Sequence, residues 1–117
     1  MIIKLIIYLY FLPPTPKDVL EECKKVGIKH PEIVVKQSIL ETGWYKHYKY
    51  NNLFGLYNSR THDYYRFDSW RESVQGYKDL VQYRYESGDY YEWLTKIGYA
   101  EDPRYIWKLK NINVSLE

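Results

Sequence analysis

One glutamate, Glu41, combines the features that a general acid requires. It falls in the last turn of a helix that the sequence pattern ends at Gly43, where unpaired carbonyl groups form the negative end of the helix dipole. It shares a predicted apolar face with Leu40, and Trp44 follows three positions later. Because burial and a negative dipole both disfavour a charged carboxylate, they raise its pKa toward the range useful for proton donation near neutral pH.

The same pattern also allows a purely structural role for Glu41. Its carboxylate can pair with Lys36, with Lys46 or with a donor in the hairpin that follows, and so tie the helix to the loop. From these residues alone, both roles stay open.

Other catalytic chemistries find no support in the sequence. The three histidines, His30, His47 and His62, show neither an HExxH motif nor another short ligand spacing, so we expect them on the surface or in loops. The single cysteine, Cys23, has no disulfide partner and no CxxC motif, and we expect it in the core on the apolar side of a helix. A GxSxG motif is absent. We therefore expect no metal site and no cofactor.

Composition limits the remaining possibilities. A chain of 117 residues and 14.3 kDa is long enough for one domain. Its 17 Lys and Arg against 15 Asp and Glu are too balanced for a nucleic-acid-binding surface, so no nucleic-acid partner is expected. The sequence has 15 Tyr and 4 Trp but only 3 Phe, and rings with a polar group suit a wet stacking surface such as a sugar groove.

Residues 1–14 form an apolar leader that ends at Pro13 and Pro14. The apolar run is shorter than the roughly 20 residues that span a bilayer, and a lysine near its start is typical of an export signal. We expect a signal-like or membrane-proximal segment, and hence an exported or cell-envelope-associated protein. The alternative is a terminal strand or helix packed on the domain, which we place at 15–117.

Helix-start and helix-stop signals predict five helices and one hairpin. The helices are expected from about Pro16 to Val26, from His30 to Gly43, from Asp68 to just before Gly88, from Asp89 to Ile97, and from Asp102-Pro103 onward. The second should bury a face made of Ile33, Val34, Gln37, Leu40 and Glu41; the third should be the longest, with a stripe of Trp70, Val74, Tyr77, Val81 and Tyr85. Two β-rich runs between Trp44 and Phe67 predict the hairpin. The class is α+β and mostly helical.

Four sequence blocks occur in the order and at close to the spacing of a known family: QSILETGW at 37–44, NNLFG at 51–55, YRFDS with ES at 65–69 and 72–73, and GYAEDPRY at 98–105. Together they cover about residues 28–112. The chain resembles the bacterial endo-β-N-acetylglucosaminidases of glycoside hydrolase family 73. The resemblance implies a lysozyme-like fold, with a catalytic glutamate at the end of a helix beside a small β-hairpin lobe.

The resemblance also implies roles for individual residues. The family's general acid falls on Glu41, and the family residues that line the floor of the groove fall on Asn52 and Phe54. Its tyrosines fall on Tyr99 and Tyr105; one of them is expected to approach the sugar, with packing behind the helix as the alternative for Tyr105. We expect the groove wall to contain Trp44, Tyr64, Tyr65 and some of Tyr45, Tyr48 and Tyr50.

A second carboxylate is less clearly marked. Asp63, at the end of the hairpin turn, is the best candidate for a second catalytic group, whereas Asp68 is better explained as a helix N-cap. If no second carboxylate reaches the site, the N-acetyl group of the substrate can act as an internal nucleophile.

The expected reaction is hydrolysis of the β-1,4 bond between N-acetylglucosamine and N-acetylmuramic acid in peptidoglycan glycan strands, by a monomer. A muramidase or lytic transglycosylase is the alternative enzyme on the same fold. A non-catalytic cell-wall-binding module is the alternative from another class.

Overall fold

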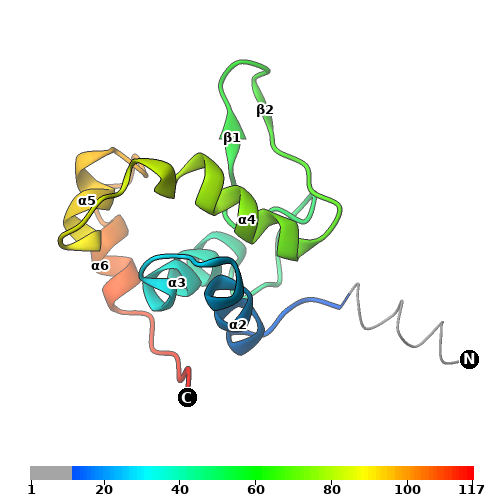
Figure 1. Cartoon of the computed structure of the whole chain (residues 1–117), viewed down its shortest axis with the longest axis horizontal. Coiled ribbons are helices and arrows are strands. Elements are labelled where there is room, and N and C mark those ends of the chain that lie inside the picture. Colours follow the sequence, from blue (N-terminus) through cyan, green and yellow to red (C-terminus); the bar gives the residue numbers. More distant parts are fainter. Residues whose placement is uncertain (1–11) are drawn as a thin grey trace, which may run out of the picture.

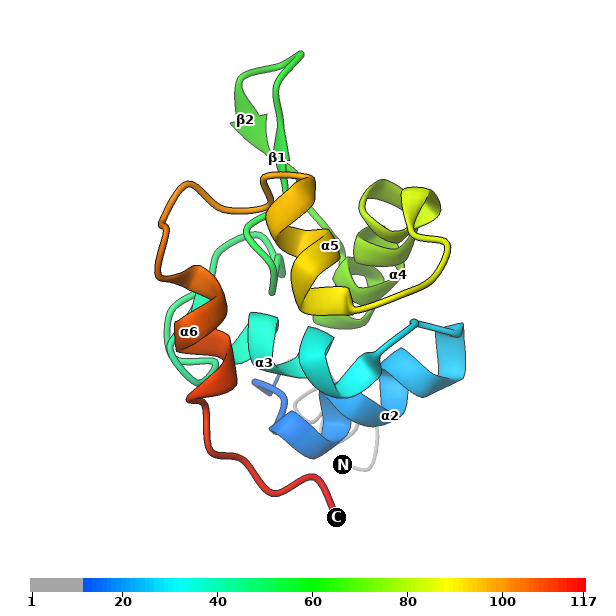
Figure 2. The ribbon, with the colours of Figure 1, turned by 90° about the vertical axis from the view of Figure 1, so that its left-hand side faces the viewer.

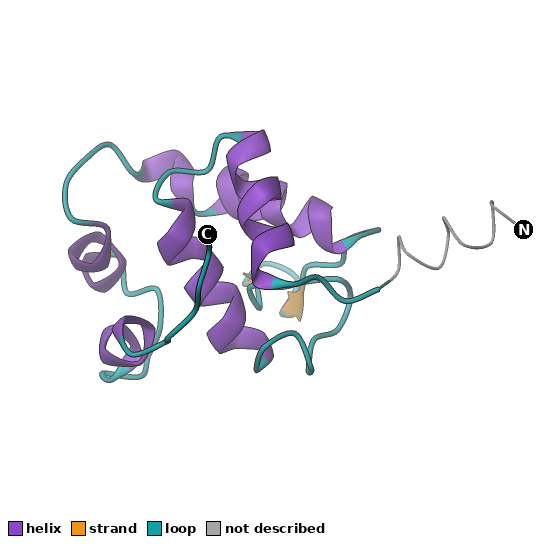
Figure 3. Cartoon of the chain, turned by 90° about the horizontal axis from the view of Figure 1, so that it is seen from below, coloured by secondary structure: helices purple, strands orange, loops and turns teal. Residues whose placement is uncertain are grey.

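The computed structural model describes residues 12–117, so most of the predicted apolar leader lies outside the described residues. The elements are α2 (Pro16–Val26), α3 (Pro31–Thr42), β1 (Tyr57–Asn58), β2 (Asp63–Tyr64), α4 (Trp70–Leu80), η1 (Gln82–Arg84), α5 (Tyr90–Lys96) and α6 (Tyr105–Lys110) (Figure 1). Helices dominate and the strands form one small antiparallel sheet (Figure 3), which confirms the predicted α+β class. Within the described part, no helix has the length and apolar character needed to cross a membrane.

The first described helix, α2, forms where its capping signals predict. The Thr15 hydroxyl accepts a hydrogen bond from the Asp18 N–H (3.1 Å), and the Asp18 carboxylate accepts one from the Thr15 N–H (2.9 Å). Gly27 ends the helix with a left-handed φ of 81°. Cys23 is fully buried on the inner side of α2, as expected.

Helix α3 carries Glu41 and lies between α2 and α6 (Figure 2). It ends at Gly43, which has a left-handed φ of 57°. The predicted buried face is wrong in detail: the buried residues are Val34, Val35, Gln37, Ser38, Ile39 and Thr42, whereas Ile33 and Leu40 are half-buried and Glu41 is exposed. Because neighbouring elements cover α3 on several sides, its buried residues do not follow one stripe.

The predicted hairpin is present and projects away from the helices (Figures 1 and 2), but each strand is only two residues long. The strands pair with Tyr57 opposite Tyr64. The run expected before the turn is interrupted by left-handed φ values at Tyr50, Asn51 and Gly55. A residue with a left-handed φ cannot continue an extended strand, so the chain turns at these positions instead.

Helix α4 begins one residue later than the cap assignment predicts. Ser69, rather than Asp68, is the N-cap, and its hydroxyl accepts a hydrogen bond from the Glu72 N–H (3.3 Å). The Glu72 carboxylate in turn accepts from the Asp68 N–H (2.8 Å). Asp68 therefore contributes its backbone to the start of the helix, and its carboxylate does not cap it.

Helix α4 is also shorter than predicted. It ends at Leu80, with 11 residues against the 12 of α3, and the chain continues as η1. The Gln82 side chain donates to the Lys29 carbonyl (2.6 Å) and accepts from the Lys29 N–H (2.9 Å), which ties the chain to the loop between α2 and α3. The predicted stripe is nevertheless buried throughout: Trp70, Val74, Tyr77, Val81 and Tyr85.

The last two helices follow their predicted signals with one shift. Asp89 caps α5 through its side chain, as expected. Helix α6 begins at Tyr105 rather than at Asp102. Asp102 forms the preceding turn, in which its carboxylate accepts a hydrogen bond from the Arg104 N–H (2.8 Å).

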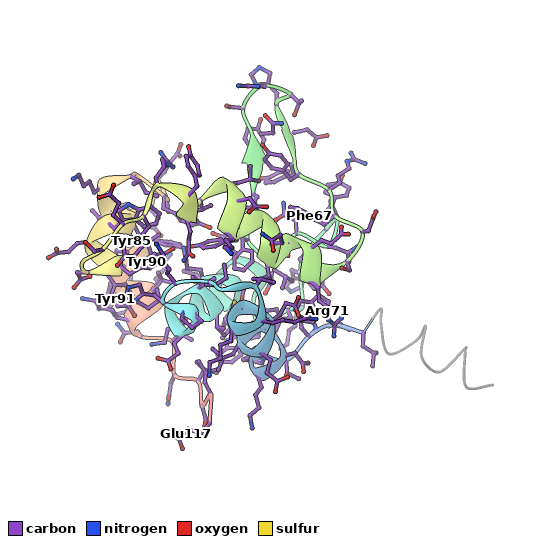
Figure 4. The ribbon with its side chains drawn as sticks, viewed as in Figure 1. Phe67, Arg71, Tyr85, Tyr90, Tyr91 and Glu117 are labelled. Carbon is purple, nitrogen blue, oxygen red and sulfur yellow. The ribbon has the colours of Figure 1, made fainter. Side chains whose placement is uncertain are left out.

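A network of buried polar side chains joins α3 to α4, α5 and α6. The Tyr77 hydroxyl donates to Gln37 Oε1 and lies 2.7 Å from the Tyr90 hydroxyl, and Gln37 Nε2 donates to the Tyr105 hydroxyl (3.1 Å). Tyr90 packs edge-on against Tyr85 with ring centroids 5.0 Å apart, at the α5 end of the molecule (Figure 4). Buried polar groups are costly unless paired, so this network specifies how the four helices meet.

We expect Tyr77→Phe to lower the free energy of unfolding by about 1–3 kcal/mol, because it leaves Gln37 Oε1 buried without a donor. Chemical denaturation measures the change. The matched control is Tyr83→Phe, which removes the same hydroxyl from a side chain that is 70% exposed. An equal, small effect of both substitutions would show that the network does not stabilise the fold.

Candidate active site

An open cleft of about 550 Å³ lies between the end of α3, the loop that follows it and the hairpin. Its lining residues are Glu41, Lys46, His47, Tyr48, Lys49, Tyr50, Asn52, Gly55 and Tyr64. The cleft therefore joins the helical body to the β-lobe, and Glu41 is the only acidic residue among those that line it.

The C-terminal end of α3 places Glu41 at the wall of this cleft. The N–H of Trp44 bonds to the Ile39 carbonyl (3.0 Å), and the left-handed Gly43 turns the chain away from the helix axis. The carboxylate lies against the backbone of Gly55, where an added Cβ would come within 3.2 Å of Glu41 Oε2. A side chain at this position would crowd the carboxylate, and Gly55 itself has a left-handed φ of 60°, which favours glycine.

The carboxylate of Glu41 has no hydrogen-bond donor and no ion-pair partner among residues 12–117. The structural alternative, a pair with Lys36 or Lys46, is therefore not formed. Glu41 is exposed toward the open cleft, yet the protein atoms around it displace enough water that this partial burial raises the pKa of its carboxyl group. A carboxyl group with a raised pKa and no internal partner is free to exchange a proton with a ligand.

Asn52 shapes the turn that faces Glu41. Its Oδ1 accepts a hydrogen bond from the Leu56 N–H (3.0 Å), and its Nδ2 donates to the carbonyl groups of Leu56 (2.9 Å) and Tyr65 (3.1 Å). Asn52 is buried and uses both ends of its amide within the protein. It borders the cleft as expected, and its main contribution is to hold the turn at Gly55 against the β-lobe.

The structure places some of the aromatic residues predicted for the groove in the cleft lining and others outside it. Tyr64 and the alternatives Tyr48 and Tyr50 line the cleft. Trp44 is 48% exposed and Tyr65 is half-buried, and neither is among the lining residues.

Two further aromatic residues expected near the sugar belong to the core. Phe54 is buried and packs on Tyr77 with ring centroids 4.7 Å apart. It therefore supports the turn at Gly55 from below, rather than forming an exposed floor. Tyr45 is also buried, and its hydroxyl lies 2.8 Å from the Ser38 hydroxyl.

Tyr99 and Tyr105 lie behind the cleft rather than in its lining. Burial raises the pKa of both tyrosines, and the carboxylate of Glu41 raises both further. Tyr105 accepts a hydrogen bond from Gln37. The buried Tyr99 hydroxyl has no hydrogen-bond partner among the described residues.

Asp63 stands apart from the cleft. It lies on the exposed strand β2, where its Oδ2 is 3.4 Å from Arg66 Nη2 and its Oδ1 accepts from the Tyr64 N–H (2.8 Å). It does not line the cleft that contains Glu41. The structure therefore does not bring the two predicted carboxylates into one pocket.

Sequence reasoning missed three residues of the cleft, namely His47, Lys49 and Gly55, and considered Lys46 only as an ion-pair partner of Glu41. Gly55 had a local signal, because a glycine that ends an NNLFG block marks a turn. His47 and Lys49 had none, since only the path of the loop brings them to the cleft. Over the part of the chain that the structure describes, no group of three or more His, Cys, Asp or Glu could hold a metal ion.

A family model described as "Glucosaminidase: Mannosyl-glycoprotein endo-beta-N-acetylglucosaminidase" matches residues 16–117. The chain belongs to this glucosaminidase family. A comparison with curated proteins finds no match. Family membership agrees with the lysozyme-like fold, a mostly helical α+β domain with a small β-hairpin lobe, and supports a peptidoglycan-related glycosidase function.

Proposed function

We propose that this protein hydrolyses the β-1,4 bond between N-acetylglucosamine and N-acetylmuramic acid in peptidoglycan, with Glu41 as the general acid. The observation that carries the proposal is the carboxyl group of Glu41, which has no partner among residues 12–117, lines an open cleft and has a pKa raised by burial. The membership of the chain in a glucosaminidase family supports the same chemistry.

In the proposed reaction, Glu41 donates its proton to the glycosidic oxygen as the bond to the anomeric carbon breaks. The sugar ring then passes through an oxocarbenium-like state. A second carboxylate at about 5–10 Å is the usual partner, either as nucleophile or as base. The described cleft has no acidic lining residue besides Glu41, which favours attack by the substrate's own N-acetyl oxygen on the anomeric carbon.

Water then completes the proposed reaction. Glu41, now a carboxylate, accepts a proton from a water molecule that attacks the anomeric carbon and releases the acetamido oxygen. Product and enzyme return to their starting protonation states without a metal or cofactor.

Tyrosine rings supply the proposed sugar-binding surface. Tyr64 and Tyr50 border the cleft from the hairpin and from the loop after α3. The Arg66 guanidinium lies 4.2 Å from the centre of the Tyr50 ring, which fixes the orientation of that ring. Sugar C–H faces can stack on such rings while the phenol groups stay hydrated.

Analysis of the product ends tests the proposal. The protein is incubated with purified peptidoglycan, and the soluble fragments are reduced and identified by mass spectrometry. We expect glucosaminitol at the reduced ends. Muramitol would indicate a muramidase and an anhydro-muramyl end a lytic transglycosylase, while binding without soluble fragments would indicate a wall-binding module; each of these results would overturn the proposed bond or activity.

The proposed substrate also indicates where the protein acts. Because this polymer lies outside the cytoplasmic membrane, we propose that the protein acts after export, in the cell envelope.

A further inference from the structure

One side of the cleft is basic. Lys46, His47 and Lys49 all line it from the loop that follows α3. None of the three side chains has a hydrogen-bond or ion-pair partner among residues 12–117, and Glu41 is the only acidic residue in the lining. Two lysines without carboxylate partners beside a cleft create a positive potential that attracts anions.

The backbone of this loop is held at both ends. At its start, the N–H groups of Lys46 (3.1 Å) and His47 (2.9 Å) both bond to the Thr42 carbonyl. At its end, the Asn52 N–H bonds to the Lys49 carbonyl (3.0 Å). The basic side chains therefore extend from fixed backbone positions, which favours a specific contact over a diffuse charged surface.

The two lysines do not set the charge state of Glu41. Neither forms an ion pair with it, and burial alone accounts for its raised pKa, whereas a closely placed ammonium group would lower that pKa. A neutral sugar polymer does not require ammonium groups for its recognition. An anionic substituent on the substrate would give the two lysines a role.

We propose that Lys46 and Lys49 bind carboxylates attached to the muramic acid residue of the substrate, in its lactyl group or in the stem peptide. This inference rests on the proposed function and assigns to the two lysines the recognition of the anionic groups of that substrate. The ammonium group is a point charge on a flexible stem, which suits carboxylates whose position varies along the glycan strand.

The test compares the substrate affinities of two variants: Glu41→Gln alone, and a triple variant that also carries Lys46→Gln and Lys49→Gln. Both contain Glu41→Gln because this substitution prevents turnover during the measurement. Calorimetry measures binding of a peptide-bearing N-acetylglucosamine–N-acetylmuramic acid oligomer and of a neutral N-acetylglucosamine oligomer of equal length. We expect the lysine substitutions to weaken binding of the anionic oligomer about fivefold to tenfold at low salt, and binding of the neutral one by less than about twofold. Salt should weaken only the anionic interaction.

A control removes the same charge elsewhere. Lys24→Gln with Lys25→Gln neutralises two exposed lysines in the last turn of α2, neither of which lines the cleft, and should leave both affinities unchanged. Equal losses for both oligomers in the cleft variant, or no loss for either, would overturn the inference. These binding results decide it even if no bond is cleaved, in which case the proposed function fails separately.

Two substrates distinguish the source of the carboxylate. In the peptide-bearing oligomer the lactyl carboxyl is bound as an amide to the stem peptide and carries no charge. An amidase hydrolyses this bond, removes the stem peptide and leaves a free lactyl carboxylate on muramic acid. If the lysine substitutions weaken binding of the stripped oligomer as much as binding of the peptide-bearing one, a carboxylate at the lactyl position is sufficient as the ligand. If the effect disappears, the stem peptide is the ligand.

Discussion

Glu41→Gln is expected to lower the rate of muropeptide release from purified peptidoglycan by about a hundredfold or more. Glutamine keeps the volume and the polar end of the side chain but has no carboxyl proton to donate to the glycosidic oxygen. Turbidity loss and chromatography of soluble fragments measure the rate. The control is Glu32→Gln, in the first turn of the same helix, which removes an exposed carboxylate away from the cleft and should leave the rate unchanged.

The same substitution should not weaken the fold. Glu41 has no partner to lose within the described part of the chain, and its raised pKa means that the folded state prefers the protonated carboxyl. That preference stabilises the fold below the unfolded pKa and is lost as the pH rises through the folded pKa. At pH values above the raised pKa the wild type holds an unfavourable carboxylate, so glutamine should give an equal or higher Tm there. A lower Tm together with lost activity would indicate a structural role for Glu41.

Gly55→Ala is expected to reduce activity about tenfold to a hundredfold, because it displaces the proton donor from its working position. The added methyl group would lie 3.2 Å from Glu41 Oε2, so the carboxylate or the turn must shift. The left-handed φ of 60° adds a strain of about 1–2 kcal/mol, which lowers stability as well. Activity assays on peptidoglycan and thermal unfolding measure the two effects.

Gly98→Ala is the control that separates the effect of backbone strain from the effect of the contact with the Glu41 carboxylate. Gly98 has a similar left-handed φ of 66°, but a methyl group there would meet nothing within 4 Å. It should therefore lose similar stability while keeping its activity at temperatures where it is folded. An equal loss of activity in both alanine variants would contradict a specific contact between Gly55 and the carboxylate.

Helix ends could be predicted from the sequence because capping is local. Thr15 with Asp18, and the left-handed Gly27 and Gly43, act within a few residues of themselves. The position of Glu41 in the last turn of α3 follows from the same signals. These local signals do not show which elements pack on the helix. The predicted buried face therefore omitted Val35, which is fully buried.

The lining of the cleft could be predicted only in part, because it depends on contacts between distant segments. Asn52, from the NNLFG block, and Tyr64, expected as an aromatic residue of the groove wall, both line the cleft, whereas Phe54 turned inward onto Tyr77 in α4. No sequence pattern shows that the turn at Gly55 meets Glu41, since the two come together only when the loop after α3 folds back.

The dependence of kcat/KM on pH, for the wild type and for Glu41→Gln, tests the central claim most directly. Because the acid form is the active one and burial raises its pKa, kcat/KM should fall as the pH rises through this pKa, at a higher pH than an ordinary glutamate would give. Glu41→Gln should lose this fall and keep only a low residual rate, while Glu32→Gln should retain it. A wild-type fall that persists unchanged in Glu41→Gln would show that another group donates the proton.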